Sequence, residues 1–580
     1  MILMTAALVI LAIVVGILVL HLLRKDDELK EKNDVIVREV RRNQLLIDRA
    51  VQNGVKRAAM LSIAAILIPA AMLTSCTDNI DTHVNPVEEP VKTASELLSA
   101  IPGVTIIKDT VDREKKTVTY FYFEQPIDHN NPAAGTFSQY CVLHYKGPNH
   151  YTVLHTQGYS TQEPKKFIQL HLATNLDANY IEVEHRYYKH SLINFVEGKT
   201  NCYGDYWDAN TAAQSTADLH AIVTALKGTG CFKNKWVSTG VSKNGILTAL
   251  YAYFYPNEVD VYVPFCAPFC TGPEAPGIGE WLSKRCGLDN DNETQLRKDI
   301  WAAFQRIASD KELQEGITAC YNQEHHTNFS VQAITRYVLF EYMRNMFYKF
   351  CYTQTSEWDG VIPNENLSAE VYYRFALLGN EGYAKKLKQL CEIVGDEYEV
   401  IDSYDDDWDY MMDDDDYNDT DTQAARRRAP DRTMKLDKLL KVIYSVHAAT
   451  ELGHFLYDWS PLTDNDLITQ DELAWLKNRQ TITRNLDWYG VTNDGGKLMN
   501  GFLDFVKNNR NKDKCKMVFV YGGNDPWTGA AIPDPADDDP YVKKHIVPKG
   551  VHSGWINNPV QYPQADKDWI MNTVNEMLKK

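Results

Sequence analysis

Three residues that could form a hydrolytic triad occur in order along the chain, and the first is Ser242. It lies in Gly-Val-Ser-Lys-Asn, between a strand-like apolar run at 236–239 and a helix-like apolar run at 246–255. A sharp strand-to-helix turn leaves room only for small residues around a nucleophilic serine. Asn244 replaces the usual second glycine, but asparagine tolerates unusual backbone angles. The segment predicts a nucleophile elbow, with an ordinary turn as the alternative.

A serine hydroxyl needs a histidine to take its proton and a carboxylate to orient that histidine. Asp525 lies in Gly-Gly-Asn-Asp-Pro-Trp after the strand-like run 517–521, and His552 follows in Gly-Val-His-Ser-Gly. In sheets with a nucleophile elbow the acid precedes the histidine in the chain. An Asp-Pro turn and a surface histidine are the alternatives. The joint order favours a triad of Ser242, Asp525 and His552.

Short apolar runs alternate with helix-like stretches around these residues. The strand-like runs are 117–124, 136–145, 151–156, 180–183, 236–239, 259–265 and 517–521. Helix-favouring stretches lie at 210–227 and 245–255. This alternation indicates an α/β fold with a mostly parallel sheet and crossover helices. The region 271–500 is helix-favouring and rich in Tyr and Trp, and it predicts an inserted helical cap.

The composition excludes several classes of protein. The chain has 580 residues, of which 44% are hydrophobic, and a net charge of −18. It is therefore neither collagen-like nor disordered, and it does not bind nucleic acid through bulk positive charge. Segment 402–421 holds 11 aspartates but lacks the glycine of a calcium loop, which favours a solvated loop. With no zinc-like Cys and His spacing either, we predict no metal and no cofactor.

Two apolar segments precede the body of the protein. The run at 2–23 is long enough to span a bilayer. A second run at 58–72 follows two basic residues and closes with Leu-Thr-Ser-Cys at Cys76. That order is typical of an export signal, and the ending resembles the lipobox of bacterial lipoproteins. We expect Cys76 to be lipidated and residues 1–54 to be absent from the mature protein; a transmembrane anchor at 2–23 is the alternative.

These patterns divide the chain into six parts and place its body outside a membrane. Pairing among some of the ten cysteines after Cys76 is plausible there. The parts are an extension at 1–54, a lipoprotein-type signal peptide at 55–76, a tether at 77–100, the first part of the core at 101–270, the cap at 271–500 and the second part of the core at 501–580.

Five ordered landmarks resemble those of the secreted bacterial tripeptidyl aminopeptidases. They are Phe-Glu-Gln-Pro-Ile-Asp-His at 123–129 with Gly-Thr-Phe at 135–137, Glu-His-Arg-Tyr-Tyr at 184–188, Gly-Val-Ser-Lys at 240–243, and Asp-Pro-Trp at 525–527. Lysosomal Pro-Xaa carboxypeptidases and dipeptidyl peptidases share most of them. The resemblance covers roughly 100–270 and 515–560.

The resemblance implies an α/β-hydrolase core with a helical cap and a Ser242–Asp525–His552 triad. It also implies peptide substrates and the release of short peptides, in particular tripeptides, from free N-termini. A proline-preferring carboxypeptidase or dipeptidyl peptidase is one alternative, and an esterase is another. A catalytically inactive, lipid-anchored binding protein is the alternative from a different class.

An oxyanion hole needs two N–H donors that are in place before the reaction. The elbow offers the backbone N–H of Lys243. The second donor is expected from the loop after 151–156, where Gly158 and Tyr159 allow close approach.

Three further residues are candidates for substrate contacts. Trp527, beside the acid, and Trp555, beyond the histidine, could line an apolar P1 pocket; ordinary core packing is the alternative. An exopeptidase that counts residues must also hold the terminal ammonium with a carboxylate. Glu184 is our candidate, with a structural pair to Arg186 as the alternative.

Overall fold

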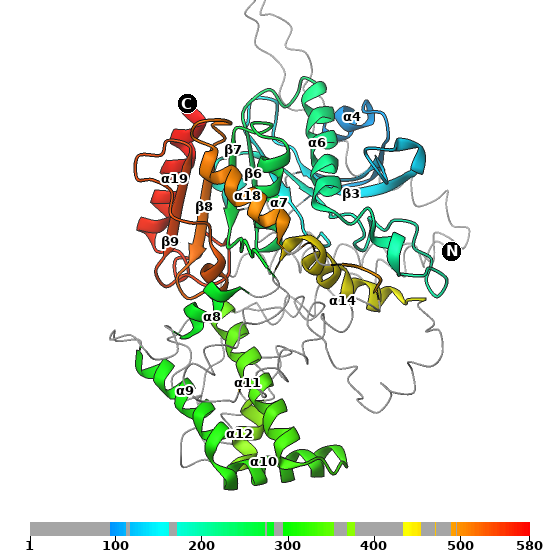
Figure 1. Ribbon diagram of the computed structural model, residues 1–580. Helices are drawn as coiled ribbons and strands as arrows, with labels where there is room; N and C mark the ends of the chain where they lie inside the picture. The colour runs from blue at the N-terminus through cyan, green and yellow to red at the C-terminus, as the bar shows by residue number, and fades with distance from the viewer. Residues whose placement is uncertain are drawn as a thin grey trace, which may run out of the picture. The chain divides into compact units, whose positions relative to one another are not determined.

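The computed structural model (Figure 1) describes residues 93–111, 117–161, 171–272, 275–283, 294–352, 368–376, 433–453, 470, 489–492, 494 and 496–580. The predicted extension, the signal peptide with Cys76, and the acidic segment 402–421 lie outside these residues. No helix in the described part is long and apolar enough to span a membrane.

One mixed sheet of nine strands forms the core, in the order β1-β2-β3-β5-β4-β6-β7-β8-β9. The strands are β1 (Val104–Val111), β2 (Thr117–Pro126), β3 (Thr136–His144), β4 (Thr152–Thr156), β5 (Asn179–Val183), β6 (Trp236–Val241), β7 (Val261–Phe265), β8 (Met517–Gly522) and β9 (Val542–Val547). The pairs β1–β2, β2–β3 and β3–β5 are antiparallel, and all later pairs are parallel. This is the α/β-hydrolase arrangement with one additional edge strand, β1, and it confirms the predicted fold class.

Helices cover both faces of the sheet because the central strands are apolar on both sides. In β8, Phe519 packs with a cluster that includes side chains of α6 (Ala212–Gly228), α7 (Lys243–Phe254) and α18 (Lys497–Asn508). Val520 points the other way, into a cluster with α5 (His171–Asn175) and α19 (Gln564–Lys579). The period-2 alternation of a strand thus supplies two separate apolar layers.

The ordered body begins before residue 101. Residues Ala94–Ser99, which we assigned to the end of the tether, form helix α4. Thr93 and Glu96 form a capping box at its start, and Leu98 is fully buried in the core. This part of the tether segment therefore belongs to the packed domain.

The described elements between 271 and 496 are helical. They are α8 (Pro276–Ser283), α9 (Thr294–Ser309), α10 (Lys311–His325), α11 (Val331–Tyr352), α12 (Ala369–Ala376), α14 (Leu436–His447) and the π-helical turn η9 (Ala448–Leu452). Helix α8 contacts η10 (Pro526–Ala530), which directly follows Asp525. The contact requires glycine on both sides, since a Cβ at Gly277 would lie 2.0 Å from the carbonyl oxygen of Gly529.

Candidate active site

Ser242 occupies a strained turn between β6 and α7. Its backbone has φ 60° and ψ −127°, a combination that residues other than glycine rarely adopt. The Ser242 N–H donates to the carbonyl of Phe265 at 2.9 Å, which ties the turn to the end of β7. The predicted strand-turn-helix is confirmed, and the serine side chain is half-buried at its apex.

The residues around the serine are small where the backbone closes on itself. A Cβ at Gly240 would lie 2.4 Å from the carbonyl oxygen of Asn244, and one at Gly245 would lie 2.6 Å from that of Phe265. Asn244 has a function that glycine could not perform. Its Oδ1 accepts from the N–H of Gly158 at 2.6 Å, and its Nδ2 donates to Gln157 Oε1 at 3.0 Å. The side chain therefore holds the loop after β4 against the elbow.

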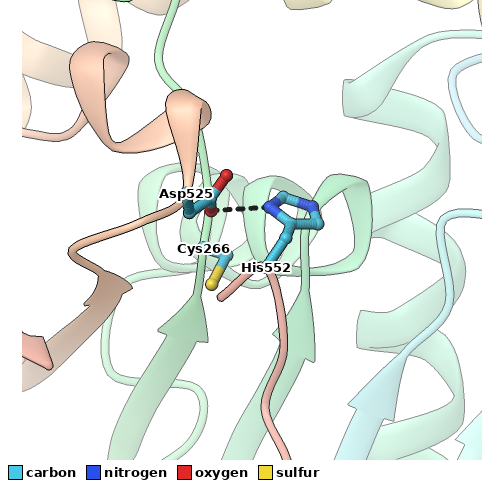
Figure 2. Close-up of side chains that lie close together, drawn as sticks. All are labelled: Cys266, Asp525 and His552. Carbon is cyan, nitrogen blue, oxygen red and sulfur yellow. Dashed lines mark hydrogen bonds and ion pairs between the residues drawn. The ribbon is translucent and has the colours of Figure 1, made fainter. Parts of the chain in front are cut away.

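Asp525 and His552 form a buried pair (Figure 2). Asp525 follows β8, and His552 lies in the loop after β9. His552 Nδ1 and Asp525 Oδ2 are 2.6 Å apart, and the side chains are 2% and 0% exposed. Asp525 Oδ1 accepts from the N–H of Trp527 at 3.0 Å. With Nδ1 engaged by the carboxylate, Nε2 is the nitrogen that can take a proton.

The pair and the serine lie at the same edge of the sheet. Ser242 and Asp525 follow the carboxyl ends of β6 and β8, parallel strands on either side of β7, and His552 follows that of β9. A Cβ at Gly554 would lie 2.6 Å from Cγ2 of Val241, so the histidine loop packs against the residue before the serine. The structure thus places the three predicted residues at the same edge of the sheet, where open α/β sheets bind their ligands.

Cys266, which the sequence interpretation did not assign to the site, lies beside this pair (Figure 2). Its Sγ approaches the carbonyl oxygens of Val551 at 3.8 Å and Ser553 at 3.5 Å, on either side of His552. It has a positive φ of 47° at the end of β7, and burial raises the pKa of its thiol well above the ordinary value. Its only sequence signal was proximity to the end of a central strand.

One group of potential metal ligands occurs among the described residues. Its atoms, from Cys266, Asp525 and His552, lie within 4.8 Å of one another. His552 Nδ1 already bonds Asp525. A cation would therefore have to displace the hydrogen bond that orients the histidine, and the arrangement suits proton transfer better than metal binding.

The structure corrects the assignment of Gly158 as an oxyanion donor, because its N–H is directed to Asn244. Gly158 serves instead as a point of close approach: a Cβ there would lie 2.7 Å from Cγ of Lys243. Lys243 is the first residue of α7, where a backbone N–H has no partner within the helix. Lys243 and Tyr159 thus remain the candidate donors.

Glu184 does not suit a substrate ammonium, which corrects a second assignment. The residue is 0% exposed. Its Oε1 accepts from Thr161 N at 3.0 Å and Oγ1 at 3.2 Å, and its Oε2 from His190 N at 2.8 Å and Ser191 Oγ at 2.9 Å. Burial nevertheless raises the pKa of Glu184 to about 7. The carboxyl joins two loops inside the protein and faces no substrate.

The alternative pairing of Glu184 with Arg186 is also wrong, because Arg186 bonds Asp218 of α6. Its Nε and Nη2 reach the two carboxylate oxygens at 2.8 and 2.7 Å. His129 Nε2 joins the same carboxylate at 2.7 Å, and Gln125 donates to the backbone carbonyl of Asp218 at 3.0 Å. The landmarks at 123–129 and 184–188 therefore build a buried network that ties the sheet to α6.

The two candidate pocket tryptophans differ in what the structure shows. Trp527 is half-buried, and its ring centroid lies 6.4 Å from that of His552. Trp555 is also half-buried, three positions after His552. Trp527 thus has direct ring contact with the triad, in keeping with a place in the pocket wall.

Residues 88–343 match the model of the PS-10 peptidase S37 family, a range that includes Ser242 but neither Asp525 nor His552. A prolyl tri/tetrapeptidyl aminopeptidase of Streptomyces mobaraensis is 26% identical over 219 residues, which is 37% of this chain and 41% of that protein. The chain thus matches less than half the length of this curated relative.

The chain is also similar to solved structures. The proline iminopeptidase of Mycobacterium smegmatis is 10% identical with a TM-score of 0.34, covering 79% of this chain and 99% of that one. Epoxide hydrolase A of Mycobacterium thermoresistibile is 12% identical with a TM-score of 0.29, covering 78% and 98%. The family match over residues 88–343 and the curated relative both support a serine-type peptidase, and that part of the chain is similar to the PS-10 peptidase S37 family.

Proposed function

We propose that the protein is an exported serine exopeptidase that releases short peptides, in particular tripeptides, from free N-termini through an acyl-enzyme on Ser242. The observation that carries this proposal is the buried Asp525–His552 pair at the sheet edge where Ser242 sits in its strained turn. The curated relative, named as a prolyl tri/tetrapeptidyl aminopeptidase, supports the length of the released peptide.

In the proposed mechanism, His552 Nε2 removes the proton from Ser242 Oγ as the oxygen attacks the scissile carbonyl. Asp525 holds the imidazole in the required tautomer and stabilises the imidazolium. The N–H groups of Lys243 and Tyr159 receive the developing oxyanion. His552 then gives its proton to the leaving amine. In the second half of the reaction, His552 takes a proton from water as the water attacks the acyl-enzyme, and the peptide is released from Ser242.

A proline at P1 would suit the site because a flat indole packs well against a pyrrolidine ring. Trp527 provides such a face next to His552. This preference is part of the proposal and follows from the half-buried position of that ring.

Fluorogenic tripeptide amides that end in proline would test the activity. Release of the fluorophore from the free peptide, but not from its N-acetylated form, is expected for an aminopeptidase. Cleavage that survives acetylation would reject the aminopeptidase. Cleavage after two residues would identify a dipeptidyl peptidase.

A fluorophosphonate probe tests catalysis independently of the substrate. Labelling of the wild type and not of Ser242→Ala is expected, since the probe reacts with an activated serine. Failure to label the wild type would favour the inactive binding protein.

Export through a lipid anchor at Cys76 is a proposal from the sequence alone. Mass spectrometry of the native N-terminus is expected to find a lipidated Cys76 as the first residue. Peptides from residues 24–54 in the mature protein would contradict it.

A further inference from the structure

The side chain of Lys243, next to the nucleophile, is buried between two parts of the site. Its alkyl chain lies against Gly158, since a Cβ there would be 2.7 Å from Cγ and 3.0 Å from Cδ of the lysine. The residue is 3% exposed. Lys243 and its neighbour Asn244 therefore both contact the loop that supplies the second oxyanion donor.

The amine of Lys243 is surrounded by aromatic rings. Its Nζ lies 5.3 Å from the ring centroid of Tyr159, 5.0 Å from that of Tyr188 and 5.8 Å from that of Tyr444. The hydroxyl of Tyr188 is 3.3 Å away. Tyr159 belongs to the oxyanion loop, and Tyr444 belongs to α14. One amine thus contacts the loop, the segment after β5 and a helix of the region assigned to the cap.

We propose that Lys243 is a positioning residue for the oxyanion hole, whose side chain fixes the loop 157–159 and couples its position to helix α14. The inference rests on the proposed function, because the loop matters only if an oxyanion forms there. Two neighbouring residues then hold the loop: Asn244 through hydrogen bonds to Gly158 and Gln157, and Lys243 through packing and cation–π contacts.

This placement is costly for folding. Burial lowers the pKa of Lys243 well below its ordinary value. Within the described residues, no carboxylate forms an ion pair with the amine, which contacts the rings and one hydroxyl and interacts electrostatically with the buried His185 and His447. Replacing buried charged groups with apolar side chains of similar volume is often neutral or stabilising. A lysine kept only for stability would therefore be an unfavourable choice.

Lys243→Met is the central test, because methionine keeps an unbranched apolar chain and the backbone N–H but removes the amine. We expect kcat for a free tripeptide amide to fall by about 10- to 100-fold, less than the 10²–10³ typical of an oxyanion donor that is lost outright. KM should stay unchanged, because the loop acts on the transition state. The fluorophosphonate labelling rate should fall in parallel, and the midpoint of thermal unfolding should stay the same or rise.

Matched variants of Tyr444 test the coupling to α14. Tyr444→Phe keeps the ring face and should leave kcat near the wild-type value. Tyr444→Leu removes the face and should lower kcat in the same direction as Lys243→Met, again without a change in KM.

The outcomes separate this inference from the proposed function. If the wild type reacts and Lys243→Met has the same kcat and labelling rate, the positioning role is wrong and the proposed peptidase function is unaffected. A loss of kcat that matches only the loss of folded protein would overturn the positioning role as well. A wild type that neither labels nor cleaves would overturn the proposed function, and the positioning role with it.

Discussion

At the scale of single residues, the Asp525–His552 hydrogen bond determines which nitrogen can act as a base. Because Nδ1 lies 2.6 Å from the carboxylate, Nε2 is the nitrogen left to act on Ser242 in the proposed mechanism. The bond is shielded from water, since neither side chain is more than 2% exposed. Orientation and electrostatic support thus come from one contact.

Asp525→Asn should therefore lower kcat by roughly 10⁴-fold while the protein stays folded. The amide has nearly the shape of the carboxylate, but it stabilises the wrong tautomer of His552. Steady-state kinetics together with a thermal melt check this result. A loss smaller than tenfold at unchanged stability would contradict the role of Asp525.

Cys266 should influence the rate without reacting itself. Its sulfur contacts the carbonyls on both sides of His552, so Cys266→Ala should let the histidine loop shift and lower kcat by up to about 10²-fold. Cys515→Ala is the matched control, because that cysteine is equally buried but precedes β8 at the end opposite Asp525. Equal kinetics for the two variants would show that Cys266 has no positioning role.

At the scale of elements, the elbow depends on how closely β6 and α7 approach each other. The first turn of α7 passes Gly240 so closely that its Asn244 carbonyl occupies the place of a Cβ. The strain at Ser242 persists because the hydrogen bond to Phe265 and the packing of both elements over-determine the turn.

Gly240→Ala should force the first turn of α7 away from β6 and so change the backbone at Ser242. The added Cβ would lie 2.4 Å from a backbone oxygen, which cannot rotate away as a side chain could. We expect a loss of about 1–3 kcal/mol in the free energy of unfolding and a loss of fluorophosphonate labelling. Gly228→Ala, at the end of α6, has open space around it and should lose neither. Equal labelling of Gly240→Ala and the wild type would contradict the geometry of the elbow.

At the scale of the whole molecule, a buried acid makes stability depend on pH. Burial raises the pKa of Glu184 to about 7 from an ordinary 4.5. The folded state thus holds this proton more tightly than the unfolded state, so the contribution to stability is complete below pH 4.5 and is lost as the pH rises through 7.

Comparison with Glu184→Gln isolates this contribution. From pH 4.5 to 8, the free energy of unfolding of the wild type should fall relative to that of the variant by roughly 3 kcal/mol. Denaturant titrations at several pH values measure the difference. A difference that does not change with pH would show that folding leaves the pKa of Glu184 unshifted.

The sequence by itself determined the α/β fold class, and it predicts Ser242, Asp525 and His552 as the triad. A strand followed by a tight turn can be recognised from a few adjacent residues. The ends of parallel strands lie at one edge of the sheet, so residues that follow them are expected there. The order of the three residues could therefore be recognised without any knowledge of distances.

Only the tertiary structure decided the surroundings of Glu184, Gly158, Cys266 and the side chain of Lys243. Each depends on partners outside its own segment, which lie between 6 and 23 residues away for Glu184 and much further away for the other three. Glu184 is saturated by donors from two separate loops, and Gly158 gives its N–H to Asn244, which lies 86 residues later. Whether a polar group faces substrate or protein depends on which donors folding brings to it, and the spacing of residues along the chain does not contain that information.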